Sequence, residues 1–147
     1  SDKGVYVLAA TNHPERIDKA VLRTGRIDEM VYIDMPDMEA RKSLFALALS
    51  KLPTEGNIDM THLSELTNGY NCSDISYIVK SAARKKFNET IKDPDGKKYG
   101  ITQDVLEEII ATRSPSVTAR SLREYERVRS EFSPKDKGLK PVTIGFR

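Results

Sequence analysis

Two stretches near the start of the chain carry side chains that could bind a phosphate group. Asn12 follows an apolar run, and its amide can both donate and accept hydrogen bonds, which suits contact with a phosphate oxygen or a water. Arg23 and Arg26 flank Thr24 and Gly25, so that two guanidinium groups project from one loop. Such permanently charged, planar groups can clamp a phosphate supplied from outside the chain. Taken singly, these residues also fit an ordinary turn and an ordinary solvated basic loop.

The residues needed to bind and hydrolyse a nucleotide unaided are missing. No Gly-x-x-x-x-Gly-Lys-Ser/Thr phosphate loop occurs in the 147 residues. Residues 30–34 superficially resemble a magnesium-binding strand of such enzymes, but Met35 follows where a catalytic Glu would be needed. The two histidines and the single cysteine are far apart, which predicts no metal site. We therefore expect the chain by itself neither to hydrolyse ATP nor to bind it tightly.

Composition and charge exclude several kinds of partner. There are 24 Lys and Arg against 22 Asp and Glu, a formal net charge of +2. Nucleic acids and membrane surfaces attract proteins with a clustered excess of positive charge, so neither partner is expected. No apolar run is long enough to span a bilayer. One cysteine cannot form an internal disulfide, which favours a reducing, cytoplasmic compartment.

Two strands are expected to position the N-terminal candidates. The apolar runs 5–10 and 30–33 are typical of strands covered on both faces, as in a parallel α/β sheet. Two such strands alone do not make a stable sheet. Residues 1–36 are therefore predicted to be the C-terminal remnant of a larger α/β core.

The rest of the chain is predicted to be helical. From residue 37 onward apolar residues recur with helical spacing, which predicts a bundle of four to five helices over 37–133. Residues suited to cap these helices at their N-termini are Asp37, Asp59, Asn71, Thr102 and Thr118. Residues 134–147 form a basic tail with Gly and Pro. The predicted fold class is thus mainly α, with two residual strands.

Residues 10–28 resemble the second region of homology of AAA ATPases, and further motifs that resemble this family follow in the right order and spacing. The similarity covers 10–28, 32–37, 40–41 and 63–75, and it persists to 116–117 and 125–126. It thus extends over nearly the whole chain. The sequence most resembles the valosin-containing, katanin and proteasome-regulatory branches of that family.

This resemblance implies a role for each candidate residue. Asn12 corresponds to sensor 1, which senses the γ-phosphate and helps orient the attacking water. Arg23 and Arg26 correspond to arginine fingers that reach the ATP site of the next subunit in a ring. Residues 37–133 correspond to the helical lid, in which Cys72 and Ser73 would face the base and ribose of the nucleotide.

The sequence departs from the family pattern at three places. Cys72 and Ser73 replace the usual Gly-Ala pair, and their larger side chains would narrow the approach to the nucleotide. Ala48 stands where many relatives have a His that touches the adenine. The phosphate loop is absent, so the simplest interpretation is a piece of a longer ATPase.

The resemblance also implies a cofactor and partners for that longer protein. They are ATP with Mg²⁺, the neighbouring subunits of a homo-oligomeric ring, expected to be a hexamer, and a protein substrate. The alternative is a non-catalytic helical protein-interaction domain, which predicts that the gene encodes only this chain. A third hypothesis, a basic helical nucleic-acid binder, is disfavoured by the near-neutral charge.

Overall fold

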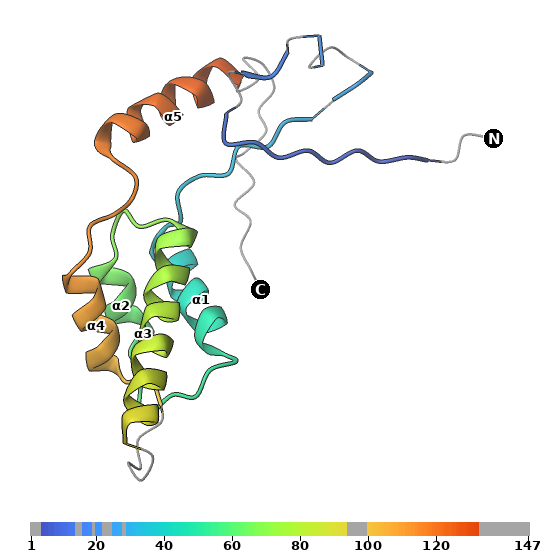
Figure 1. The fold of residues 1–147 in the computed structure, drawn as a ribbon. Helices are drawn as coiled ribbons and strands as arrows, with labels where there is room; N and C mark the ends of the chain where they lie inside the picture. Colours follow the sequence, from blue (N-terminus) through green and yellow to red (C-terminus); the bar gives the residue numbers. More distant parts are fainter. Residues whose placement is uncertain are drawn as a thin grey trace. The chain divides into compact units, whose positions relative to one another are not determined.

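The fold of the chain is mainly helical, as predicted (Figure 1). The computed structural model describes residues 4–13, 16–18, 20–21, 25–27, 29–93 and 100–132. The helices of the described residues are α1 (Met38–Leu49), α2 (Met60–Leu66), α3 (Cys72–Lys92), α4 (Gln103–Ala111) and α5 (Ala119–Phe132). The predicted tail over 134–147 lies outside the described residues. None of the helices in the described part of the chain is both long and apolar enough to cross a membrane.

The helices begin where the capping residues predict. The carboxylates of Asp37 and Asp59 accept hydrogen bonds from backbone N–H groups in the first turns of α1 and α2. Asn71 and Asp74 form a reciprocal capping box at the start of α3. The hydroxyl of Thr102 accepts from a first-turn N–H of α4. These bonds satisfy donors that the helices cannot satisfy internally, so local sequence sets where each helix starts.

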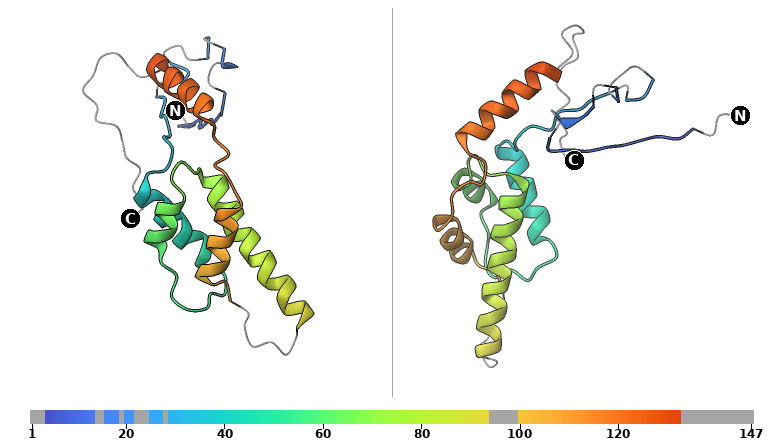
Figure 2. Two further views of the ribbon diagram at one scale, coloured as in Figure 1. Left: turned by 90° about the vertical axis from the view of Figure 1, so that its left-hand side faces the viewer. Right: turned by 45° about the horizontal axis from the view of Figure 1, so that its top comes forward.

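Helices α1 to α4 enclose one hydrophobic core. Helix α1 packs against α2 and α3, and α3 also packs against α4. Side chains that are fully buried between them include Phe45, Leu63, Ile75, Ile78 and Leu106. The yellow C-terminal part of α3 extends past α1 in both views of Figure 2. Its apolar side chains Phe87 and Ile91 are accordingly exposed.

A close backbone contact joins the loop after α1 to the start of α4. Thr54 and Ile101 form an isolated parallel bridge. The N–H of Glu55 donates to the Ile101 carbonyl at 2.9 Å, and the N–H of Ile101 donates to the Pro53 carbonyl at 2.8 Å. Gly100 is buried here, and a Cβ on it would lie 2.6 Å from backbone atoms of Thr54 and Glu55. Only glycine fits this approach without a shift of the backbone.

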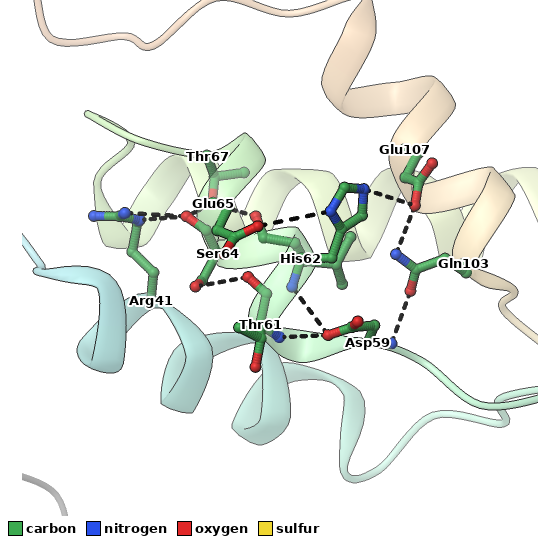
Figure 3. Close-up of polar contacts among 10 residues, drawn as sticks. Arg41, Asp59, Thr61, His62, Ser64, Glu65, Thr67, Gln103 and Glu107 are labelled. Atoms are coloured by element: carbon green, nitrogen blue, oxygen red, sulfur yellow. Dashed lines mark hydrogen bonds and ion pairs between the residues drawn. The ribbon is translucent and has the colours of Figure 1, made fainter.

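A buried arginine ties the beginning of α1 to α2. Arg41 is only 5% exposed. Its Nε and Nη2 donate to the Ser64 carbonyl at 3.1 and 3.0 Å, and its Nη1 donates to the Pro36 carbonyl at 2.8 Å. Figure 3 shows this fork directed at Ser64, in the middle of α2. Arg41 therefore holds the chain where it enters the helical unit.

A polar network on the other side of α2 reaches α4 (Figure 3). The His62 ring lies 3.5 Å from the Glu107 carboxylate and 3.9 Å from that of Glu65. Gln103 accepts a hydrogen bond from the Asp59 N–H at 3.0 Å and donates to Glu107 at 2.6 Å. His62 thus belongs to a surface network between two helices.

The described chain divides into two compact units. One runs from Asp34 to Thr118 and contains α1 to α4, and the other contains the described residues up to Ile33 together with α5. In the second unit the Arg129 guanidinium lies over the Tyr32 ring, 5.6 Å from its centre, and Val128 is buried. From the sequence, we expect α5 to belong to the same domain as α1 to α4. The predicted domain boundaries, 1–36 and 37–133, stay predictions.

The strands predicted over 5–10 and 30–33 are not formed in this chain. Both runs have irregular backbone, and Val5, Tyr6, Val7 and Leu8 are 78–99% exposed. A strand covered on both faces needs neighbouring strands for its backbone hydrogen bonds and helices for its side chains. The described residues supply no neighbouring strand for either run.

Candidate functional site

Asn12 lies in an exposed turn after the apolar run 5–10. The His13 N–H donates to the Thr11 hydroxyl at 2.9 Å, and the Arg16 N–H donates to the His13 carbonyl at 3.0 Å. These hydrogen bonds form a turn directly after the apolar run 5–10. Asn12 itself is exposed. Its amide is therefore accessible to a ligand, with the donor and acceptor needed to hold a phosphate oxygen or a water.

Arg26 lies in a turn that its own side chain closes. Gly25 has a φ of +87°, a left-handed conformation that glycine adopts without strain. The Arg26 Nη1 donates to the Ala20 carbonyl at 2.9 Å. A guanidinium has five N–H donors, so this bond leaves others for an anion. Arg23, the second predicted finger, lies outside the described residues.

Cys72 and Ser73 form the exposed first turn of α3. Both side chains are exposed, and the Cys72 thiol is free. The capping box places the Asn71 amide oxygen on the Asp74 N–H at 2.9 Å. The N-terminal end of a helix carries a partial positive charge, so this turn is favourable for a negatively charged or strongly polar group.

Behind that turn lies a buried polar cluster that the sequence did not predict. Asp74 is 2% exposed, and its Oδ2 accepts hydrogen bonds from the Ser116 N–H at 3.1 Å and the Ser116 hydroxyl at 2.9 Å. The Tyr70 hydroxyl donates to the Arg113 carbonyl at 2.6 Å. Burial, with a further contribution from the charge of Asp74, raises the pKa of Tyr70 above its ordinary value, although Arg113 acts in the opposite direction.

One signal for this cluster was present in the sequence. Asp74 is identifiable from the sequence as a capping residue. A carboxylate can accept several hydrogen bonds, so Asp74 can bind a second partner besides the backbone N–H that it caps. Which partner it binds depends on how α4 packs against α3, and spacing along the chain does not reveal that.

The candidate residues are divided between the two compact units. Asn12 and Arg26 belong to the unit that includes the chain up to Ile33, and Cys72 and Ser73 belong to the unit from Asp34 to Thr118. In the described ranges no group of three or more His, Cys, Asp or Glu side chains could hold a metal ion.

Comparison with known proteins defines the family. Residues 1–35 match the model of the "ATPase family associated with various cellular activities (AAA)". The chain therefore belongs to the AAA ATPases, as the motifs around Asn12 and Arg26 predicted. It is 34% identical to the cell division cycle protein 48 homolog of Archaeoglobus fulgidus, an alignment that includes 88% of this chain. The chain is thus similar to a protein of the cell division cycle protein 48 type, and it spans 19% of the length of that relative.

Proposed function

We propose that this chain is the part of an AAA ATPase that senses nucleotide and acts on the neighbouring ATP site. The observation that carries the proposal is the family match of residues 1–35, the stretch that holds Asn12, Arg23 and Arg26. The similarity to an archaeal relative over most of the chain supports the same assignment for the helical part.

Asn12 is proposed as sensor 1. An amide at this position can hold the attacking water with its oxygen and a γ-phosphate oxygen with its N–H groups. The exposure of Asn12 directly after the run 5–10 agrees with this role. Ligands of α/β cores bind at the carboxyl ends of the strands, and this is where Asn12 would lie once the run is paired in a sheet.

Arg23 and Arg26 are proposed as arginine fingers for the ATP site of the next subunit. A guanidinium in that place stabilises the negative charge that develops on the transferred phosphoryl group. In other nucleotide hydrolases such a finger contributes about 10³–10⁵ in rate. Arg26 would keep its bond to Ala20 or exchange it for the phosphate, and Gly25 gives the loop the turn it needs.

Residues 37–133 are proposed as the helical lid of the same ATPase. Cys72 and Ser73, exposed at the start of α3, would face the base and ribose of the nucleotide. Their side chains are larger than the usual Gly-Ala pair, so the approach would be narrower. ATP with Mg²⁺ would be bound mainly by a phosphate loop outside this sequence, and Mg²⁺ would neutralise phosphate charge there.

The whole protein is proposed to work as a cytoplasmic, homo-oligomeric ring. A finger that acts on a neighbouring site requires that subunits assemble head to tail, and closure of such contacts gives a ring. We propose a hexamer in which the nucleotide state moves the lid and so remodels a protein substrate.

The experiment begins with the coding sequence upstream of residue 1. The proposal requires a phosphate loop and an Asp-Glu strand end there, and their absence would favour a non-catalytic interaction domain. A second test uses the full-length protein, in which Arg26→Ala should lower ATP turnover about 10³-fold while ATP affinity changes little. Arg16→Ala in the same segment is the matched control and should leave ATP turnover within about twofold of the wild type. Loss of ATP binding with unchanged turnover of bound ATP would contradict a role in the neighbouring site.

A further inference from the structure

The chain after α4 is attached to the start of α3 through Arg113 and Ser116. We call residues 113–116 the docked segment. We propose that Asp74 is a positioning residue that holds the docked segment against the first turn of α3, so that the two move as one body. Bending between the unit that ends at Thr118 and α5 is then confined to the residues after Ser116.

Asp74 makes the central contacts. Its Oδ2 accepts from both the N–H and the hydroxyl of Ser116, at 3.1 and 2.9 Å. The same oxygen accepts from the Asn71 N–H at 3.3 Å, which belongs to the capping box. The Asn71 side-chain amide donates to the Ser116 hydroxyl at 2.9 Å. One buried carboxylate thus joins the cap of α3 to a residue more than forty positions later, and bonds to a charged acceptor are the stronger kind.

The other end of the docked segment, Arg113, also contacts residues in and just before α3. The buried Tyr70 donates its hydroxyl to the Arg113 carbonyl at 2.6 Å. The Arg113 guanidinium lies over the Tyr77 ring, 3.8 Å from its centre, and its Nη2 is 3.8 Å from Asp74 Oδ1. The segment therefore has partners at both ends, at Arg113 and at Ser116.

The arrangement has a mechanical consequence. Cys72 and Ser73 precede Asp74 in the same helical turn, and the docked segment leads through two further residues into α5. A displacement of the first turn of α3 would therefore move the docked segment, and with it the start of the two-residue link to α5, by the same amount. That bound nucleotide causes such a displacement rests on the proposed function. The attachment of the docked segment to α3 can be tested on this chain without nucleotide.

Hydrogen exchange of backbone amides measures the attachment directly, because the Ser116 N–H is bonded to Asp74. In Asp74→Asn, which keeps the size of the side chain and removes its charge, exchange at Ser116 should accelerate about tenfold or more. Exchange at Val105, whose N–H is bonded to the cap of α4, should change by less than about twofold. Asp104→Asn, an exposed acid in the first turn of α4, is the matched control and should leave Ser116 unchanged.

The pattern of exchange separates positioning from general stability. A residue that only stabilises the fold would accelerate the amides of Ile78 and Val79, in the buried part of α3 beyond its first turn, as much as that of Ser116, and this would overturn the proposal. Unchanged exchange at Ser116 would also overturn it. If Asp74→Asn does not fold, the double change Tyr70→Phe and Ser116→Ala removes two hydroxyl groups and the three hydrogen bonds they make, while keeping the capping box. It should accelerate exchange of the backbone amide at position 116 selectively, and uniform or absent acceleration would refute the inference.

Discussion

Replacement of Arg41 by methionine should destabilise the helical unit strongly. The guanidinium donates two hydrogen bonds to the Ser64 carbonyl and one to the Pro36 carbonyl, all between 2.8 and 3.1 Å, from a side chain that is 5% exposed. Methionine retains the apolar stem but makes none of these bonds. The perturbation therefore removes the polar contacts with little change in packing volume.

The expected magnitude follows from the two acceptors. A hydrogen bond that involves a charged group contributes about 1.5–3 kcal/mol to stability, so two acceptor sites correspond to about 3–6 kcal/mol. Part of this is offset because removing a buried charge ends its desolvation cost. The Thr67 hydroxyl is 3.4 Å from the Ser64 carbonyl, but its one proton donates mainly to the Leu63 carbonyl at 2.8 Å, so it offsets little of the loss. We expect a net loss of about 2–4 kcal/mol in the free energy of unfolding.

Urea and thermal unfolding followed by far-ultraviolet circular dichroism provide the assay. A loss of this size should lower Tm by about 10 °C or more. Arg84→Met, at an exposed position on α3, is the matched control and should change stability by less than about 0.5 kcal/mol. Arg41→Lys should fall between the two, because an ammonium group cannot reproduce the planar fork. Equal stability of Arg41→Met and the wild type would refute this account of how α1 is attached.

Two further predictions concern the same unit. Gly100→Ala should lower the free energy of unfolding by about 1–3 kcal/mol, because the added Cβ would lie 2.6 Å from backbone atoms that must shift. Gly4→Ala is the control, because Gly4 is exposed and its added Cβ would make only an ordinary contact, 3.8 Å from a ring carbon of Tyr6; equal effects of the two changes would contradict the steric reason. The raised pKa of Tyr70 means that the folded state holds this proton more tightly than the unfolded chain. Its contribution is therefore fully present below its ordinary value of 10.0 and lost as the pH rises through the raised value. Unfolding of wild type and Tyr70→Phe, measured between about pH 9 and 11.5, should show a steeper loss in the wild type, and parallel curves would argue against it.

Local signals account for what the sequence predicted correctly. Asp37, Asp59, Asn71 and Thr102 each cap the helix expected of them, because a cap depends only on the next three residues. Helical spacing likewise predicts the buried residues Ile75, Ile78, Val79 and Ala82 of α3, but it was wrong for Phe87, which has the same spacing and is exposed.

Features that depend on distant residues were not predictable in this way. Arg41 reads as one polar residue of an amphipathic helix, and only the packing of α2 against α1 shows that it is buried. The partnership of Asp74 with Ser116 depends on the path of the chain after α4. The strands over 5–10 and 30–33 have the right composition, but a strand forms only when partners complete its hydrogen bonds.

A mixing experiment on the full-length ATPase tests the central claim that these arginines serve a neighbouring ATP site. Two variants are needed, Arg26→Ala and one in which the phosphate-loop lysine is replaced, and each should be nearly inactive alone. Mixed rings should regain ATP turnover, because some sites then combine an intact phosphate loop with an intact arginine from the next subunit. Mixed rings that form but recover no turnover, or full activity of Arg26→Ala alone, would contradict the account.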